Sequence, residues 1–242
     1  MITRRHEGPI HLFLTDQVPA YLTGWTLVEA PEYLLLCDTG LGLASMEPVK
    51  EVLKDIRGGR PLYVFNTHAH WDHVGGNGAF PDARLLASPL TIKALKEHYE
   101  EERRTNRSWM DEEAPLVLPE PFPSLPFQLP GEGLIFPSPG HTRDSLSFYL
   151  PSQGLLLAGD NLERPLIYVE DSDLEGYIRT LEGYLALRPR RIIASHSPDL
   201  ACRDIEETLS YLQALKDGGP VKLKDPGQAR VHEENLQFLK KA

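Results

Sequence analysis

Three histidines and one aspartate fall within six positions of this sequence, in the segment H-A-H-W-D-H that begins at His68. The segment follows an apolar run that predicts a buried strand over residues 62–65. Imidazole and carboxylate groups are good ligands for zinc and similar divalent cations, and a loop at a strand end can direct alternate side chains toward one point. We therefore expect His68 and His70 to share one metal ion, with Asp72 and His73 facing a second.

The isolated histidines of the chain carry no such expectation. A single histidine on a loop is usually solvated or hydrogen-bonded, whereas a chance H-x-H-x-D-H pattern is much rarer. The ordinary role is expected for His6, His11, His98 and His232.

The order of the ligand-type residues resembles the metallo-β-lactamase superfamily, in which H-x-H-x-D-H is followed by a distant His, then Asp, then His, each at a strand end. Here P-G-H-T contains His141, L-A-G-D ends at Asp160, and A-S-H-S contains His196. Upstream, C-D-T-G around Asp38 resembles the family's D-T-G, whose aspartate supports the metal loop. The resemblance covers about residues 10–200 and implies the same fold.

This resemblance implies a centre with two divalent metal ions, Zn²⁺ first and Mn²⁺ or Fe²⁺ as alternatives. The first metal would be bound by His68, His70 and His141, the second by Asp72, His73 and His196, and Asp160 would bridge the two. The implied reaction is hydrolysis of an ester, thioester, lactone or phosphodiester by a water or hydroxide bridged between the metals. Asp72 is the candidate catalytic residue, because it can orient that water or move its proton.

Asp160 and the residues after it indicate which families of the superfamily this chain resembles most. True β-lactamases of the superfamily typically have Cys or Ser where this chain has Asp160, so a β-lactam is an unfavoured substrate. Quorum-lactone hydrolases carry a Tyr where this chain has Glu163. The ligands fit glyoxalase II, although that family's glycine-cysteine-rich glutathione-binding segment is not found after Asp160. The expectation is thus a glyoxalase II-like metal-dependent hydrolase of unidentified substrate.

Three alternatives stay open at this point. Persulfide dioxygenases resemble glyoxalase II but use one iron, which would be held by His68, His141 and Asp160. An RNase Z-like nuclease shares the ligands, and a non-catalytic metal-binding module is a third reading of the same residues. Metal content and thiol-dependent oxygen uptake separate the first alternative from a hydrolase.

The elements that must position these residues alternate between strands and helices, which indicates an α/β or α+β domain, and the resemblance specifies a four-layer αββα sandwich. Apolar runs separated by turn residues predict strands over 10–14, 21–29, 33–37, 62–65, 134–136, 145–150, 155–158 and 191–194. Helical spacing predicts helices over 174–187, 204–216 and about 228–240. We expect one domain over residues 1–242.

Further helices are expected around the metal segment. Ser45 is expected to cap a helix whose apolar residues are Val49, Val52, Leu53 and Ile56. Gly75 and Gly76 would let the backbone turn tightly and start a helix beneath the site.

The long insertion before His141 is a candidate lid over the metals. The charged stretch within 91–113 predicts an exposed helix, and six prolines within 115–130 predict an irregular connection. We expect a lid insertion at about 91–130, with Trp109 and Met110 as its apolar lid contacts.

Composition favours a globular protein with a small-molecule substrate. The chain has 242 residues, a formal net charge of −10 and only two cysteines, Cys37 and Cys202. The negative charge disfavours nucleic acid as a partner. No apolar stretch approaches a membrane span and no export segment is apparent, so a cytoplasmic location is expected. Oligomeric state is left open.

Overall fold

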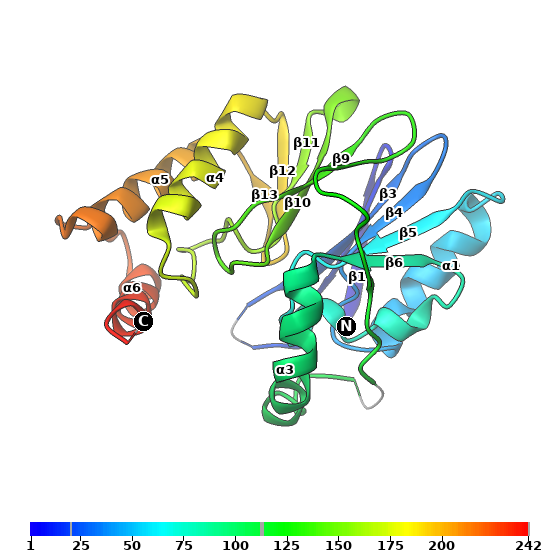
Figure 1. The fold of residues 1–242 in the computed structure, drawn as a ribbon, viewed down its shortest axis with the longest axis horizontal. Helices are drawn as coiled ribbons and strands as arrows, with labels where there is room; N and C mark the ends of the chain where they lie inside the picture. The colour runs from blue at the N-terminus through cyan, green and yellow to red at the C-terminus, as the bar shows by residue number, and fades with distance from the viewer. Residues whose placement is uncertain (20, 112–113, 242) are drawn as a thin grey trace. The chain divides into compact units, whose positions relative to one another are not determined.

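The computed structural model describes residues 1–19, 21–111 and 114–241. It divides into two compact units, Met1–Gly131 and Glu132–Ala242, each of which contains a β-sheet with its own helices (Figure 1). Among the described helices, none is both long and apolar enough to cross a membrane.

The sheet of the first unit begins antiparallel and continues parallel. Its strands, which neighbour one another in chain order, are β1 (Ile2–Glu7), β2 (Ile10–Thr15), β3 (Thr23–Glu29), β4 (Leu34–Cys37), β5 (Leu62–Phe65), β6 (Arg84–Ala87) and β7 (Glu120–Pro121). Pairs from β1 to β4 are antiparallel, and pairs from β4 to β7 are parallel. A two-residue strand, β8 (Phe127–Gln128), follows in the chain but does not belong to this sheet. The parallel pairing of β4 with β5 brings their carboxyl ends to one edge of the sheet.

The described part of the first unit also contains the α-helices α1 (Glu47–Ile56), α2 (Trp71–Val74) and α3 (Pro89–Thr105). α1 buries Val49, Val52 and Leu53 in a cluster with apolar residues of the sheet, as its spacing predicts. The predicted cap was wrong, because Met46 occupies the N-cap position without a side-chain hydrogen bond. Ser45 lies in a preceding 3₁₀ turn (Ala44–Met46), where its N–H and hydroxyl donate to the Asp111 carboxylate at 2.7 and 2.8 Å.

The sheet of the second unit has the strand order β13-β12-β11-β10-β9. Its strands are β9 (Leu134–Pro137), β10 (Leu146–Leu150), β11 (Leu155–Leu157), β12 (Arg191–Ala194) and β13 (Ser197–Leu200). β11 and β12 are parallel, while β10 runs antiparallel to both β9 and β11. Consequently the β9–β10 loop and the carboxyl ends of β11 and β12 lie at the same edge.

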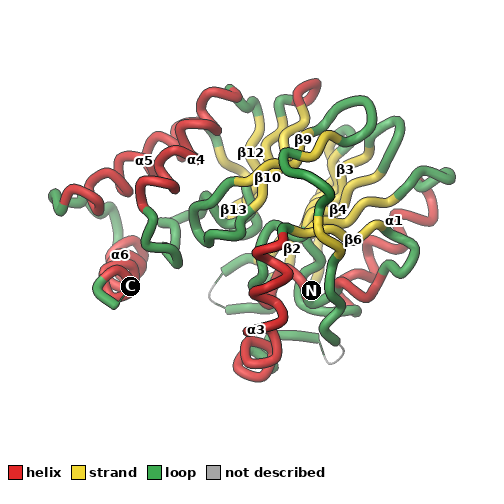
Figure 2. The backbone as a smooth tube through the Cα atoms, in the orientation of Figure 1, coloured by secondary structure: helices red, strands yellow, loops and turns green. Residues whose placement is uncertain are grey.

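Among the residues described for the second unit are the α-helices α4 (Leu174–Leu187), α5 (Cys202–Asp217) and α6 (Pro226–Leu239). α4 has the predicted bounds and is capped by Asp173, whose carboxylate accepts from the Gly176 N–H at 2.8 Å. α4 and α5 lie side by side (Figures 1 and 2). Their apolar faces form one buried cluster with Leu156 of β11 and Ile192 of β12. The strands whose following loops lie at this edge are therefore held by a packed core.

His11 is hydrogen-bonded, as expected of an isolated histidine, but it is buried rather than solvated. It lies on β2 and is 1% exposed, rather than on a solvated loop. The Arg4 guanidinium donates to His11 Nδ1 at 2.8 Å, so the neutral ring carries its proton on Nε2. Burial, followed by the charges of His6 and Arg4, lowers the pKa of His11 from 6.5 to about 4.

This lowered pKa makes the folded state sensitive to moderate acid. Between pH 6.5 and about 4 the unfolded chain takes up a proton at His11 that the folded chain does not, so stability present above pH 6.5 is lost as the pH falls. His11→Gln should remove up to about 3 kcal/mol of this loss. Urea unfolding of both proteins at pH 7 and pH 4.5 measures it. Equal pH slopes in the two proteins would refute the assignment.

Candidate metal centre

In the first unit, the predicted metal loop emerges beside Asp38. Because β4 and β5 are parallel with Cys37 opposite Phe65, Asp38 and the loop from residue 66 leave the sheet at one edge. The Asp38 carboxylate accepts from the Thr67 N–H at 2.7 Å and from the Thr67 hydroxyl at 2.8 Å. The supporting role predicted for Asp38 is therefore visible as direct hydrogen bonds to the loop.

The same carboxylate fixes which nitrogen of His73 carries its proton. His73 Nδ1 lies 2.9 Å from Asp38 Oδ2, and an ionised carboxylate can only accept, so Nδ1 donates. In the neutral ring Nε2 then carries the lone pair, as a metal ligand must. Both side chains are almost completely buried.

Two pairs of predicted ligands come together within this loop. His68 Nε2 and His70 Nδ1 are 2.9 Å apart, and His73 Nε2 lies 3.7 Å from Asp72 Oδ1. The His68 Nδ1 faces the Thr67 hydroxyl at 3.0 Å, which itself donates to Asp38. The structure therefore places His68 beside His70 and Asp72 beside His73.

The glycines after the loop have a different role from the one expected. The helix α2 (Trp71–Val74) precedes Gly75 and Gly76 rather than starting at them, and only a 3₁₀ turn (Asn77–Ala79) follows. What the glycines allow is a close backbone approach. A Cβ at Gly75 would lie 2.6 Å from the Leu41 carbonyl carbon, and one at Gly76 would lie 2.4 Å from the Thr39 oxygen.

Gly75→Ala should therefore destabilise the protein by about 2–3 kcal/mol, because the obstructing atoms are backbone and cannot rotate away. Gly183→Ala is the matched control, since no described atom lies within 4 Å of a Cβ built at that exposed position of α4. The control should gain about 0.5–1 kcal/mol from its higher helix propensity. Urea unfolding gives both values, and equal stability of the two variants would contradict the packing argument.

In the second unit, the remaining predicted ligands sit at one sheet edge. His141 lies on the β9–β10 loop, Asp160 follows β11, and His196 follows β12. Asp160 Oδ2 is 3.0 Å from His196 Nε2 and 4.0 Å from His141 Nε2. All three side chains are at most 7% exposed.

Hydrogen bonds hold His141 at three points. Its N–H donates to Asn161 Oδ1 at 2.8 Å, its carbonyl accepts from the Glu170 N–H at 3.1 Å, and its Nδ1 lies 2.9 Å from the Tyr168 carbonyl oxygen. A carbonyl can only accept, so Nδ1 carries the proton and Nε2 faces Asp160 with its lone pair. The Asn161 backbone carbonyl also accepts a hydrogen bond from the Tyr177 hydroxyl at 2.9 Å.

Glu170 is a nearby charged residue that sequence reasoning missed. Its Oε1 lies 4.0 Å from His141 Nε2, the same distance as Asp160 Oδ2. No motif surrounds Glu170, and 29 positions separate it from His141, so only the fold brings the two together. Unlike Asp160, its side chain is 46% exposed.

The seven predicted ligands are all among the described histidines and carboxylates that could hold a metal ion. Imidazole nitrogens and carboxylate oxygens fit zinc, manganese or iron(II), and the fixed tautomers of His73 and His141 suit ligation through Nε2. Cys37 and Cys202 are free thiols outside these groups.

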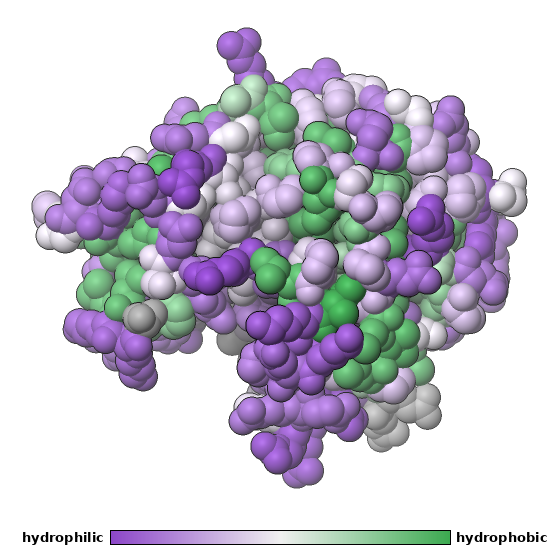
Figure 3. Space-filling view, viewed as in Figure 1, coloured by the Kyte–Doolittle hydropathy of each residue, from purple (hydrophilic) through white to green (hydrophobic). Residues whose placement is uncertain are grey.

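The charged helix α3 is attached to the metal loop. Glu102 Oε2 accepts from the Trp71 N–H at 3.0 Å, at the start of α2. Leu95, Tyr99 and Met110 belong to one buried cluster with Trp71. The predicted exposed helix therefore has one buried face, while hydrophilic side chains cover its outer surface (Figure 3). Met110 is buried in this cluster, and Trp109 is 38% exposed.

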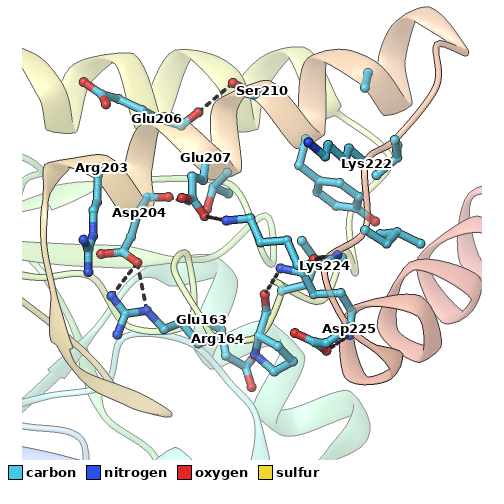
Figure 4. A pocket seen from close by; sticks show the side chains of 18 of the residues that line it. Glu163, Arg164, Arg203, Asp204, Glu206, Glu207, Ser210, Lys222, Lys224 and Asp225 are labelled. Carbon is cyan, nitrogen blue, oxygen red and sulfur yellow. Dashed lines mark hydrogen bonds and ion pairs between the residues drawn. The ribbon is translucent and has the colours of Figure 1, made fainter.

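A pocket of about 960 Å³ lies elsewhere in the second unit (Figure 4). The loop after Asp160, helix α5 and the connection to α6 line it, and two ion pairs join these segments. Arg164 Nη2 lies 2.6 Å from Asp204 Oδ1, and Lys224 Nζ lies 2.5 Å from Glu207 Oε2. None of the predicted ligands is among its lining residues, so the pocket is distinct from the candidate centre.

The sequence of this chain is similar to those of known proteins. A family model described as the metallo-beta-lactamase superfamily matches residues 21–196. A hydroxyacylglutathione hydrolase from Thermosynechococcus vestitus is 33% identical over 123 residues, which are 49% of this chain but only 41% of that protein. The Bacillus subtilis protein YobT, described as uncharacterized, is 27% identical over 207 residues, covering 80% of this chain and 78% of its own length.

Solved structures match over most of the chain. The mono-zinc form of the metallo-beta-lactamase FIM-1 from Pseudomonas aeruginosa has a TM-score of 0.69 at 19% identity, covering 88% of this chain and 96% of that one. A metallo-beta-lactamase from Hirschia baltica has a TM-score of 0.67, also at 19% identity, with 87% and 97% covered. These matches confirm the predicted fold class.

Proposed function

Because the chain belongs to the metallo-beta-lactamase superfamily, we propose that it is a hydrolase dependent on two divalent metal ions, with zinc the first expectation and manganese or iron(II) the alternatives. The observation that carries the proposal is the fixed tautomer of His73 and His141. Each donates its Nδ1 proton to an acceptor held by the fold, which leaves Nε2 as the ligand atom.

The proposed ligand set is the one implied by the order of the motifs. His68, His70 and His141 would hold the first ion, Asp72, His73 and His196 the second, and Asp160 would bridge them. The close spacing of these side chains within each unit supports the assignment. Three protein ligands for each ion plus one bridge leave room for water and substrate, as in catalytic rather than closed structural sites.

Two bound cations would supply a water of lowered pKa and would offset the negative charge that develops on the substrate. The chain's own residues do the rest. Asp38 keeps His73 in the ligating tautomer through Nδ1, and the Tyr168 carbonyl does so for His141. Asp72 would orient the attacking water or take its proton. Asp72→Ala with full metal content and undiminished turnover would remove Asp72 from this mechanism.

The proposed substrate is a small ester, thioester, lactone or phosphodiester. The match to a hydroxyacylglutathione hydrolase supports a hydrolytic reaction, although that match spans under half of the relative's length. Asp160 at the bridging position supports a substrate other than a β-lactam.

The organisation of the chain is part of the same proposal. We take residues 1–242 to act as one domain, with the insertion at about 91–130 as a lid and Trp109 as its exposed apolar contact. Residues 112–113 of that insertion lie outside the described part of the chain. The cytoplasm stays the expected location, where the thiols of Cys37 and Cys202 would remain reduced.

A substrate panel tests the proposal directly. Protein stripped with a chelator and reloaded with zinc would be assayed on phenyl acetate, acetylthiocholine, γ-butyrolactone and bis(4-nitrophenyl) phosphate. The expected result is hydrolysis of at least one class by the reloaded protein and none by the stripped protein. Failure of fully loaded protein on all four classes would count against a hydrolase and favour a binding module.

A further inference from the structure

Glu170 lies where it can act on any group that approaches His141 Nε2. Its Oε1 is 4.0 Å from that nitrogen, and its side chain is 46% exposed, whereas the His141 side chain is 5% exposed. A residue that binds metal at the base of the centre is expected to be buried, as the Asp160 side chain is. The half-exposed carboxylate therefore lies at the rim, between solvent and the candidate ligands.

The backbone around Glu170 is held in place. Its N–H donates to the His141 carbonyl at 3.1 Å, and the preceding Tyr168 carbonyl accepts from the His141 ring at 2.9 Å. The next residue, Asp171, makes two hydrogen bonds with the Arg143 guanidinium at 2.9 and 3.2 Å. Asp171 also accepts from the Asp173 N–H at 2.9 Å, which joins the segment to the start of α4. The backbone that carries the Glu170 side chain is thus held beside His141.

Arg143 binds the residue that follows Glu170. The Arg143 guanidinium makes two hydrogen bonds to the Asp171 carboxylate, so its positive charge interacts mainly with Asp171. The electric field of a partly desolvated carboxylate extends over several ångströms. Such a carboxylate attracts a cationic substrate and repels an anionic one.

We propose that Glu170 is a specificity-determining residue that selects cationic and neutral substrates and rejects anionic ones at the candidate centre. The inference rests on the proposed hydrolase function and deepens it by narrowing the substrate class to cationic and neutral esters, thioesters and lactones, without the anionic phosphodiesters. No covalent role belongs to Glu170, since its effect is electrostatic.

A charge series tests this selection. The probes are phenyl esters of 4-(trimethylammonio)butanoate, 5,5-dimethylhexanoate and adipate, which end in a cation, a neutral isostere and an anion. The zinc-loaded wild-type protein should show a kcat/KM about tenfold or more higher for the cationic than for the anionic ester. Glu170→Gln should reduce that ratio by about tenfold, and high salt should reduce it in the wild type as well. Glu182→Gln, which removes an exposed carboxylate from α4, should leave the ratio unchanged.

Binding provides a readout that does not depend on turnover. Calorimetry would measure the affinities of the three corresponding carboxylates, which differ in their cationic, neutral or anionic distal group, for the same zinc-loaded proteins. The cation-over-anion preference should be present in the wild type and in Glu182→Gln, and lost in Glu170→Gln. Elemental analysis should find equal metal content in all three proteins.

The outcomes separate this inference from the proposed function. Hydrolysis without charge preference would overturn the role of Glu170 and leave the hydrolase intact. Charge-ordered binding without hydrolysis of any ester would support Glu170 and count against the hydrolase. A loss of metal in Glu170→Gln would overturn the inference, because Glu170 would then be a ligand.

Discussion

Asp160→Ala is expected to lose at least one of the two metal ions and to lower kcat/KM for any hydrolysed substrate by about a thousandfold. The reason is the position of its carboxylate, whose Oδ2 lies 3.0 Å from His196 Nε2 and 4.0 Å from His141 Nε2. A group proposed to contact both ions cannot be replaced by alanine without loosening both. Elemental analysis of the purified variant and steady-state kinetics measure the two effects.

A matched variant separates this effect from a general loss of acidic charge. Asp217→Ala removes an exposed carboxylate at the end of α5 and should keep full metal content and activity. Urea unfolding of the stripped proteins would establish that Asp160→Ala is folded. Full metal content with undiminished hydrolysis in folded Asp160→Ala would exclude the bridging role.

Asp38→Asn is expected to weaken metal binding by about 10–100-fold while preserving the fold. Asparagine tolerates the left-handed backbone of this position, where φ is 64°. In the native chain one carboxylate oxygen accepts from the Thr67 N–H, and the other accepts from His73 Nδ1. The amide NH₂ must replace one of these oxygens. It then either opposes the His73 donor, which forces the proton onto Nε2, or opposes the Thr67 backbone donor.

Calorimetric titration of the stripped protein with zinc measures this loss. Asp16→Asn, an exposed change before β3, should bind zinc as the wild type does. If Asp38→Asn bound zinc with wild-type affinity, the tautomer of His73 would not depend on Asp38.

The elements that carry the candidate site were accessible from sequence because their signals are local. The apolar strands β4, β5, β11 and β12 are buried and flanked by turn residues, so periodicity finds them. The ligand types and spacing after them predict metal binding without knowledge of the fold. The structure adds that parallel neighbours deliver their following loops to a common edge.

Two of the missed strands, β1 and β13, lacked a local apolar signal, whereas β6 was missed although Leu86 and Ala87 are apolar and buried. β1 is an exposed edge strand containing Arg4, Arg5 and His6, and β13 is an edge strand containing Pro198. Neither has the buried alternation that predicts a strand. Glu170 could not be found for a different reason, since its importance comes from hydrogen bonds between distant loops. The close approach at Gly75 likewise depends on backbone more than 30 positions away.

Elemental analysis of protein purified without added metal tests the central claim most directly. The proposed set of seven ligands predicts about two zinc or manganese ions per chain. One iron per chain, accompanied by thiol-dependent oxygen uptake, would contradict the two-metal hydrolase and favour a persulfide-oxidising enzyme.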